Sequence, residues 1–142
     1  MAIVISETWL DESIHNAELS ISGFTIYRVD RNNRMRGGVC IYVRNEHSVS
    51  PVTSFSNSVV EILILKNDIL NGLMIGIYRP PDTKVYQWSN ALGILNHNIT
   101  SLQRNGRYGD IYIYGDMNFH LTNWNSANST IYECSDSIKI YS

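Results

Sequence analysis

The residues best suited to chemistry lie between Tyr112 and Asn118, where the chain reads Tyr-Ile-Tyr-Gly-Asp-Met-Asn. Asp116 and Asn118 are two positions apart, so an extended chain points both side chains to the same side. A carboxylate there can accept a proton from water, and a carboxamide can hydrogen-bond a phosphate oxygen. Glycine, aspartate and asparagine are also the favoured turn residues, and on their own these residues favour a turn over an active site.

Two further candidates follow predicted strands. Glu7 comes directly after an apolar run; Mg²⁺ takes oxygen ligands and is commonly held by only one or two carboxylates. Tyr78 and Arg79 precede two prolines, and a hydroxyl and a guanidinium could bind a phosphate there. Taken singly, a solvated glutamate and a packed tyrosine are the commoner interpretations.

Hydrophobic patterning predicts six strands and one long helix. The predicted strands are Ala2–Ser6, Phe24–Val29, Val39–Arg44, Val59–Lys66, Leu73–Tyr78 and Ile111–Tyr114, and the predicted helix is Val85–Arg104. The apolar stripe of this helix consists of Val85, Trp88, Leu92, Leu95, Ile99 and Leu102. We expect this stripe, including Trp88, to face the core. These elements predict an α+β fold or part of a layered α/β sandwich.

Three expectations concern how these strands are placed. Ala2–Ser6 is apolar enough to need neighbours on both sides. Glu61 alternates with Ile62 and is expected on the solvent side of an edge strand. Two predicted hairpins join Phe24–Val29 to Val39–Arg44 and the two strands on either side of the Asn71-Gly72 turn.

Arginines gather in and before the first hairpin loop; they are Arg28, Arg31, Arg34 and Arg36. They fit a DNA-backbone grip and a solvated turn equally well.

Composition sets broad limits. The chain has 142 residues, 44% of them hydrophobic, and a net charge of −2, which suits one domain and gives no general basic surface for nucleic acid. Apolar runs are too short to span a bilayer, and Met1–Glu7 lacks the basic start of a secretory signal. Cys40 and Cys134 form neither a metal spacing nor a disulfide framework. We therefore expect an intracellular protein that is neither secreted nor membrane-bound.

The order of motifs resembles the endonuclease domain of non-LTR (LINE-like) retrotransposons, within the endonuclease/exonuclease/phosphatase superfamily. The matching motifs are Glu7-Thr8-Trp9-Leu10, Arg36-Gly37-Gly38-Val39, Tyr78-Arg79-Pro80-Pro81 and Gly115-Asp116-x-Asn118. The resemblance runs from about Ile3 to Trp124. It implies a partial two-sheet α/β sandwich over residues 1–124, with residues 125–142 as a poorly ordered tail.

The resemblance also implies an activity: hydrolysis of DNA phosphodiester bonds in the nucleus, which primes reverse transcription by a polymerase domain further along the polypeptide. It places Glu7 at the Mg²⁺ (or Mn²⁺) site, Asp116 on the attacking water, and Asn118 and Tyr78 on the phosphate. Arg79, Arg34 and Arg36 are further phosphate or DNA contacts expected from the charge of their side chains.

The sequence departs from the family in two places. An Asn-bearing strand is expected before Glu7, and a further Asp and a Ser-Asp-His are expected after Asn118. Ser135-Asp136-Ser137 has Ser at the His position and lies too close to Asn118, so we reject it. The chain therefore resembles a domain truncated at both ends, and we expect it to be inactive by itself and to self-associate through exposed sheet edges.

Two alternatives remain open. One is another phosphodiesterase or phosphatase of the same superfamily, such as an abasic-site nuclease. The other is a non-catalytic remnant that at most binds a partner. Comparing Mg²⁺-dependent nicking by the wild type and by Asp116→Ala separates the catalytic and non-catalytic readings.

Overall fold

A computed structural model describes residues 1–31, 36–57, 59–69, 71–105, 109–118 and 138–140. The strands are β1 (Ala2–Ser6), β2 (Phe24–Val29), β3 (Val39–Arg44), β4 (Val49–Ser56), β5 (Glu61–Asn67), β6 (Gly72–Tyr78), β7 (Ile111–Asp116) and β8 (Ile138–Ile140). The one long helix of the described residues is α1 (Val85–Asn105).

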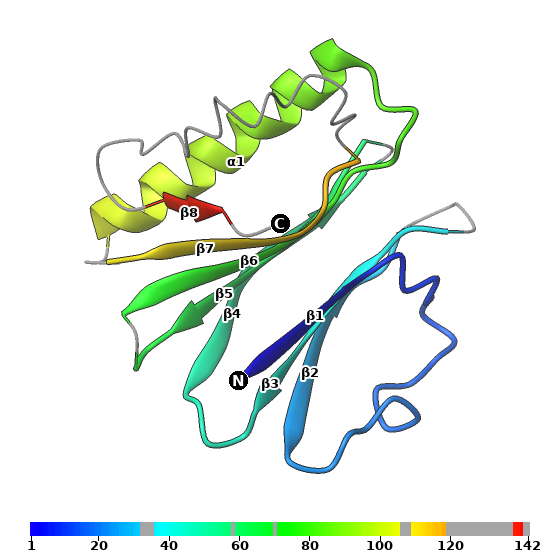
Figure 1. Ribbon diagram of the computed structural model, residues 1–142, viewed down its shortest axis with the longest axis vertical. Coiled ribbons are helices and arrows are strands. Elements are labelled where there is room, and N and C mark those ends of the chain that lie inside the picture. Colours follow the sequence, from blue (N-terminus) through cyan, green and yellow to red (C-terminus); the bar gives the residue numbers. More distant parts are fainter. Residues whose placement is uncertain (32–35, 58, 70, 106–108, 119–137, 141–142) are drawn as a thin grey trace, which may run out of the picture.

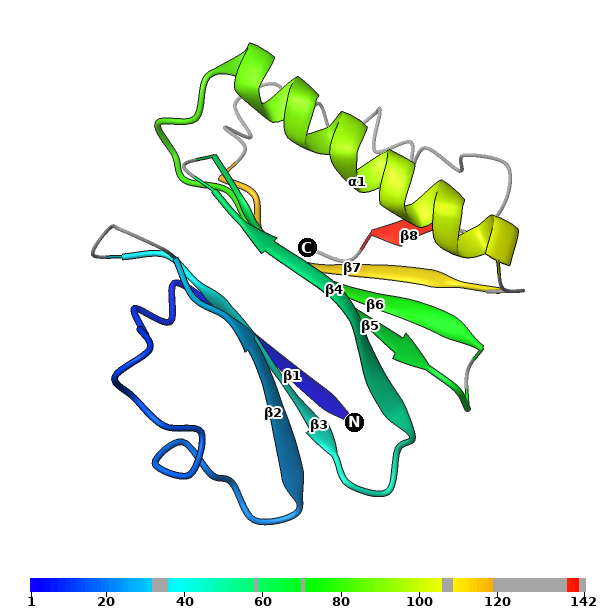
Figure 2. The ribbon, with the colours of Figure 1, turned by 180° about the vertical axis from the view of Figure 1, so that it is seen from behind.

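These elements form three layers (Figures 1 and 2). A three-stranded antiparallel sheet with the order β1-β3-β2 packs on a larger sheet with the order β4-β5-β6-β7-β8. Helix α1 covers the other face of the larger sheet. In that sheet β4, β5 and β6 are antiparallel, whereas β6, β7 and β8 are parallel. Strands β6 and β7 can be parallel because α1 carries the chain from the end of β6 back to the start of β7. The mixed α+β class predicted from the sequence is confirmed.

The core has two parts, one on each face of the larger sheet. On β5, Ile62 and Ile64 face α1, whereas Leu63 and Leu65 face the smaller sheet. Every one of these side chains is at most 3% exposed. A strand that is covered on both faces is apolar throughout, which explains why β5 and β6 read as continuous hydrophobic runs.

The predicted elements are confirmed with small shifts at their ends, and two strands were missed. The sequence of β4 contains Pro51 and several Ser residues and does not have the pattern of a strand. A proline is tolerated there because β4 lies at the sheet edge and carries an irregularity between Pro51 and Thr53. The other missed strand, β8, is three residues long. Residues 119–137 and 141–142, most of the predicted tail, lie outside the described residues.

One expectation was wrong, and a second was confirmed only in part. Strand β1 has one neighbour among the described strands, β3, and its side chains alternate between half-buried and exposed. On α1, the core-facing stripe is confirmed for Trp88, Leu95, Ile99 and Leu102. Val85 and Leu92 are exposed instead, and Ala91 packs in the core beside Trp88. The buried face of the helix is therefore rotated slightly from the predicted stripe, towards Ala91.

Candidate active site

The first pair of predicted site residues is joined by a direct hydrogen bond. Glu7 follows the end of β1, and Tyr78 is the last residue of β6. The hydroxyl of Tyr78 donates to Oε1 of Glu7. Burial, strengthened by the neighbouring Glu7 carboxylate, raises the pKa of Tyr78, so its hydroxyl remains protonated and acts as a donor.

A buried ion pair lies directly behind Tyr78. Glu61 is the cross-strand partner of Tyr78 on β5 and is fully buried. Its Oε1 lies 2.5 Å from Nε of Arg31, whose guanidinium carbon lies 5.9 Å from the centre of the Tyr78 ring. Burial raises the pKa of Glu61, while Arg31 and the N–H of Gly38 oppose that rise. The prediction of a solvent-facing Glu61 was wrong, because β5 is an inner strand and the smaller sheet covers this face.

The Gly-Asp-x-Asn segment lies next to Tyr78. Strands β6 and β7 run parallel, with Tyr78 in register with Asp116, so both strands end at the same edge. Gly115 has a φ of 138°, and a Cβ there would lie 1.8 Å from the carbonyl oxygen of Ile77. Only glycine fits such a close approach. The exposed carboxylate of Asp116 is thereby brought out at the rim of the sheet beside Tyr78.

Asn118 closes a turn against Asp116. Its backbone N–H donates to Oδ1 of Asp116 over 2.8 Å, and its own φ is 46°. Its side-chain Nδ2 donates to the carbonyl oxygen of Arg79 over 2.8 Å. A carboxamide has two N–H donors, and this bond uses one of them. The segment is therefore both a turn and the carrier of two predicted site residues.

Arg79 holds this turn in place. Its Nη1 donates to the carbonyl oxygens of Met117 (2.9 Å) and Asn118 (3.0 Å), and its Nη2 donates to that of Thr83 (3.0 Å). Its guanidinium also lies over the ring of Trp88, 5.6 Å from the centre. The structure thus gives Arg79 a positioning task, and phosphate contact by this residue stays a prediction.

The other arginines divide into internal and exposed groups. Arg28 donates to the carbonyl oxygens of Asp11 and Ile14 and pairs with Asp30 at 3.2 Å. Its side chain and that of Arg31 are 14% and 8% exposed. Both predictions for these two arginines, contact with the DNA backbone and a solvated turn, were therefore wrong. Arg36 is exposed. Arg34 lies outside the described residues.

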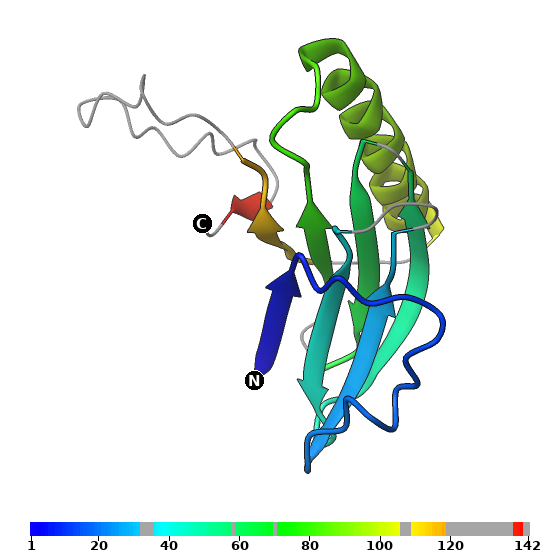
Figure 3. The same cartoon turned by 90° about the vertical axis from the view of Figure 1, so that its right-hand side faces the viewer.

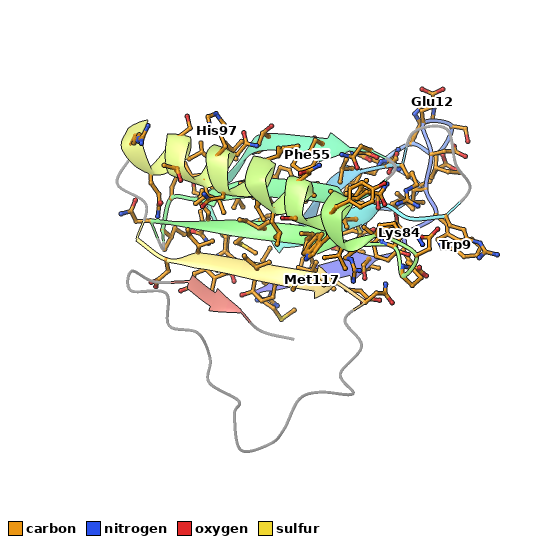
Figure 4. The ribbon with its side chains drawn as sticks, turned by 90° about the horizontal axis from the view of Figure 1, so that it is seen from above. Trp9, Glu12, Phe55, Lys84, His97 and Met117 are labelled. Carbon is orange, nitrogen blue, oxygen red and sulfur yellow. The ribbon has the colours of Figure 1, made fainter. Side chains whose placement is uncertain are left out.

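A groove of about 800 Å³ is lined by residues of β1 and β7. Figure 3 shows these two strands near one another at the same side of the molecule. Ser6 and Asp116 lie at the end where β1 leads into Glu7, whereas Met1 and His47 lie at the other end. The four steps from Ala2 to Ser6 separate these ends by about 13 Å. His15 is exposed on the loop after β1. His97 is exposed on α1 (Figure 4). Of the histidines that the structure describes, none lies with Glu7, Tyr78 and Asp116.

The groups at this rim suit a hard cation. The described residues contain no cluster of three His, Cys, Asp or Glu side chains that could hold a metal by themselves. Mg²⁺ does not need such a cluster, since one or two carboxylates, water and substrate phosphates complete its coordination. The exposed carboxylates of Glu7 and Asp116 and the amide oxygen of Asn118 are oxygen donors of this kind.

Strained backbone marks the same rim. Five described residues other than glycine have positive φ, and three of them are Glu7 (55°), Trp9 (56°) and Asn118 (46°). Such conformations are costly and persist where the surroundings impose them, often at functional sites. Trp9, Arg31 and Glu61 also belong to this region, and none of them was predicted as part of it. Trp9 lies within the Glu7-Thr8-Trp9-Leu10 motif and Arg31 within the group of arginines, whereas Glu61 lies near no motif.

No model of a known protein family matches the chain, and a search of curated proteins finds no match either. Within the described residues, no helix has the length and apolar character needed to cross a bilayer.

Proposed function

We propose that this chain carries the metal- and phosphate-binding part of a Mg²⁺-dependent DNA phosphodiesterase site, of the kind that retrotransposon endonucleases use. The observation that carries the proposal is the meeting of Glu7, Tyr78 and Asp116 at one rim. Glu7 and Tyr78 are 71 positions apart in the chain and share a hydrogen bond, and Asp116 is in register with Tyr78. Three motifs read separately from the sequence thus come together.

Each residue has a task in this proposal. Glu7 holds Mg²⁺, and Tyr78 orients the Glu7 carboxylate through its hydroxyl. Asp116 accepts the proton of the attacking water, and the remaining N–H of Asn118 donates to a phosphate oxygen. The bound metal ion supplies charge stabilisation of the scissile phosphate and the leaving oxygen.

We expect this chain by itself to hydrolyse DNA weakly or not at all. Among the described residues, no histidine lies at this rim to protonate the leaving group or to stabilise the transition state. Loss of one member of a cooperative catalytic group often costs about 10³-fold or more. A non-catalytic, DNA-binding domain is therefore the second candidate. It is favoured by the lack of a histidine at this rim among the described residues.

Two measurements test metal binding and catalysis separately. We expect Glu7→Gln to weaken Mn²⁺ binding, measured by titration calorimetry, by about 10-fold or more. Glu12→Gln, an exposed glutamate on the following loop (Figure 4), is the control and should bind as the wild type does. Equal Mn²⁺ binding by Glu7→Gln and the wild type would refute the metal site.

The second measurement is nicking of supercoiled DNA in Mg²⁺. The wild type should nick no faster than Asp116→Ala. A Mg²⁺-dependent rate that disappears in Asp116→Ala would instead establish the chain as an endonuclease in its own right.

A further inference from the structure

Trp9 is an exposed aromatic side chain on a fixed backbone. The side chain is 57% exposed and points outward at the end of the molecule away from His97 (Figure 4). Its backbone N–H donates to the carbonyl oxygen of Gly37 over 2.9 Å, and its φ is 56°. A tryptophan in a left-handed conformation is uncommon and needs its surroundings to hold it there. The backbone at Trp9 is therefore fixed by its surroundings, and it presents the indole to solvent.

Arg36 completes a pair with this ring. Its guanidinium lies 5.3 Å from the centre of the Trp9 ring, a cation–π contact, and its own φ is 92°. The turn that follows is tied to the interior, because a Cβ on Gly37 would lie 2.9 Å from Nε of Arg31. The buried Arg31–Glu61 pair thus supports the turn before β3, which carries Arg36 and accepts the hydrogen bond from Trp9.

The position of the pair links it to the proposed site. Trp9 is two residues after Glu7, and Thr8 between them packs against Gly38. The segment from Glu7 to Trp9 therefore has two contacts. Glu7 accepts a hydrogen bond from Tyr78, and the exposed Trp9 ring lies beside the guanidinium of Arg36. A flat aromatic ring stacks on any base, and a guanidinium neutralises the adjacent phosphate.

We infer that Trp9 and Arg36 form a nucleobase-stacking platform, which binds an unstacked base and the adjoining phosphate of DNA next to the Glu7 rim. This inference rests on the proposed function, because it names the part of the substrate that lies beside the metal- and phosphate-binding groups.

The test measures binding of a fluorescein-labelled oligothymidylate by anisotropy, with Ca²⁺ in place of Mg²⁺. Trp9→Ala should weaken binding about 5- to 100-fold, whereas Trp9→Phe, which keeps a stacking ring, should stay within about 3-fold of the wild type. Arg36→Ala should weaken binding and lower the slope of log affinity against log salt by about one. Tyr86→Ala and Arg104→Ala, at exposed positions on α1, are the matched controls and should leave binding unchanged.

Several results would overturn the inference. The inference fails if Trp9→Ala binds the oligonucleotide with wild-type affinity, or if Tyr86→Ala loses as much affinity as Trp9→Ala. It also fails if the wild type does not bind the oligonucleotide, or if Trp9→Ala changes only the oligomeric state seen in size-exclusion chromatography. Thermal melts of all variants should coincide, since Trp9, Arg36, Tyr86 and Arg104 are all exposed. The Mn²⁺ titration of Glu7→Gln is independent of this platform, so failure here leaves the metal part of the proposed function standing.

Discussion

Arg31 and Glu61 form an ion pair, with 2.5 Å between Nε and Oε1, in the layer between the two sheets. Their side chains are 8% and 0% exposed. Two charges removed from water are tolerated only because they neutralise one another. The pair touches Tyr78 through Arg31, so it supports the rim that carries the candidate site.

The first prediction concerns the energetics of this pair. Glu61→Leu leaves the buried guanidinium without its carboxylate and should lower the free energy of unfolding by about 3–5 kcal/mol. The double variant Arg31→Met/Glu61→Leu removes both charges and should recover most of that loss. Urea denaturation followed by far-ultraviolet circular dichroism measures both. A double variant as unstable as the single one would show that the pair itself stabilises the fold.

Glu61 also shows how far the sequence predicted this fold. Alternation along Val59–Lys66 correctly placed Glu61 opposite Ile62, but alternation does not reveal that both faces are covered. The partner, Arg31, lies 30 positions away, and pairing across layers depends on how the sheets stack. In the candidate site, Glu7, Tyr78 and Asp116 could be proposed from their motifs. The internal roles of Arg79 and Arg28 could not, because they depend on carbonyl groups brought near by the fold.

The second prediction concerns Arg79. Its planar guanidinium reaches three carbonyl oxygens that an ammonium group cannot serve in the same geometry. Arg79→Lys should therefore lower the free energy of unfolding by about 1–3 kcal/mol and speed amide exchange at Asn118. Arg104→Lys, at an exposed position on α1, is the control and should change neither quantity. Unchanged exchange at Asn118 in Arg79→Lys would mean that other contacts hold the turn.

The third prediction concerns the free edge of β1. Among the described strands only β3 pairs with it, and Ile3 and Ile5 are 38% and 42% exposed. Unpaired edges with apolar side chains promote association, and lysine on an edge opposes it. We expect the wild type to sediment as an oligomer and Ile5→Lys to shift it towards monomer. Ile94→Lys, at a similarly exposed position on α1, should have no such effect; a monomeric wild type would contradict the prediction.

The fourth prediction uses Cys40 as a reporter of opening. Its thiol is 2% exposed, and burial raises the pKa of Cys40 to about 11. At pH 8 about one thiol in a thousand is then ionised, and the thiolate is the reactive form. In a Cys134→Ser background, iodoacetamide should label Cys40 only as fast as the protein opens, and urea should accelerate the reaction. Rapid labelling of the folded chain would contradict the buried position of β3.

The last prediction concerns the hydroxyl of Tyr78. Tyr78→Phe keeps the ring between the sheets but removes the donor to Glu7. A carboxylate that has lost its orienting partner binds metal less well, and losses of about 10-fold or more are typical. Tyr112→Phe removes a hydroxyl that donates to Asp110 over 3.1 Å and is the matched control. Mn²⁺ titrations should therefore show weaker binding in Tyr78→Phe and wild-type binding in Tyr112→Phe. Equal affinity in both variants would mean that Tyr78 supports Glu7 only as part of the packing, with no influence on the metal.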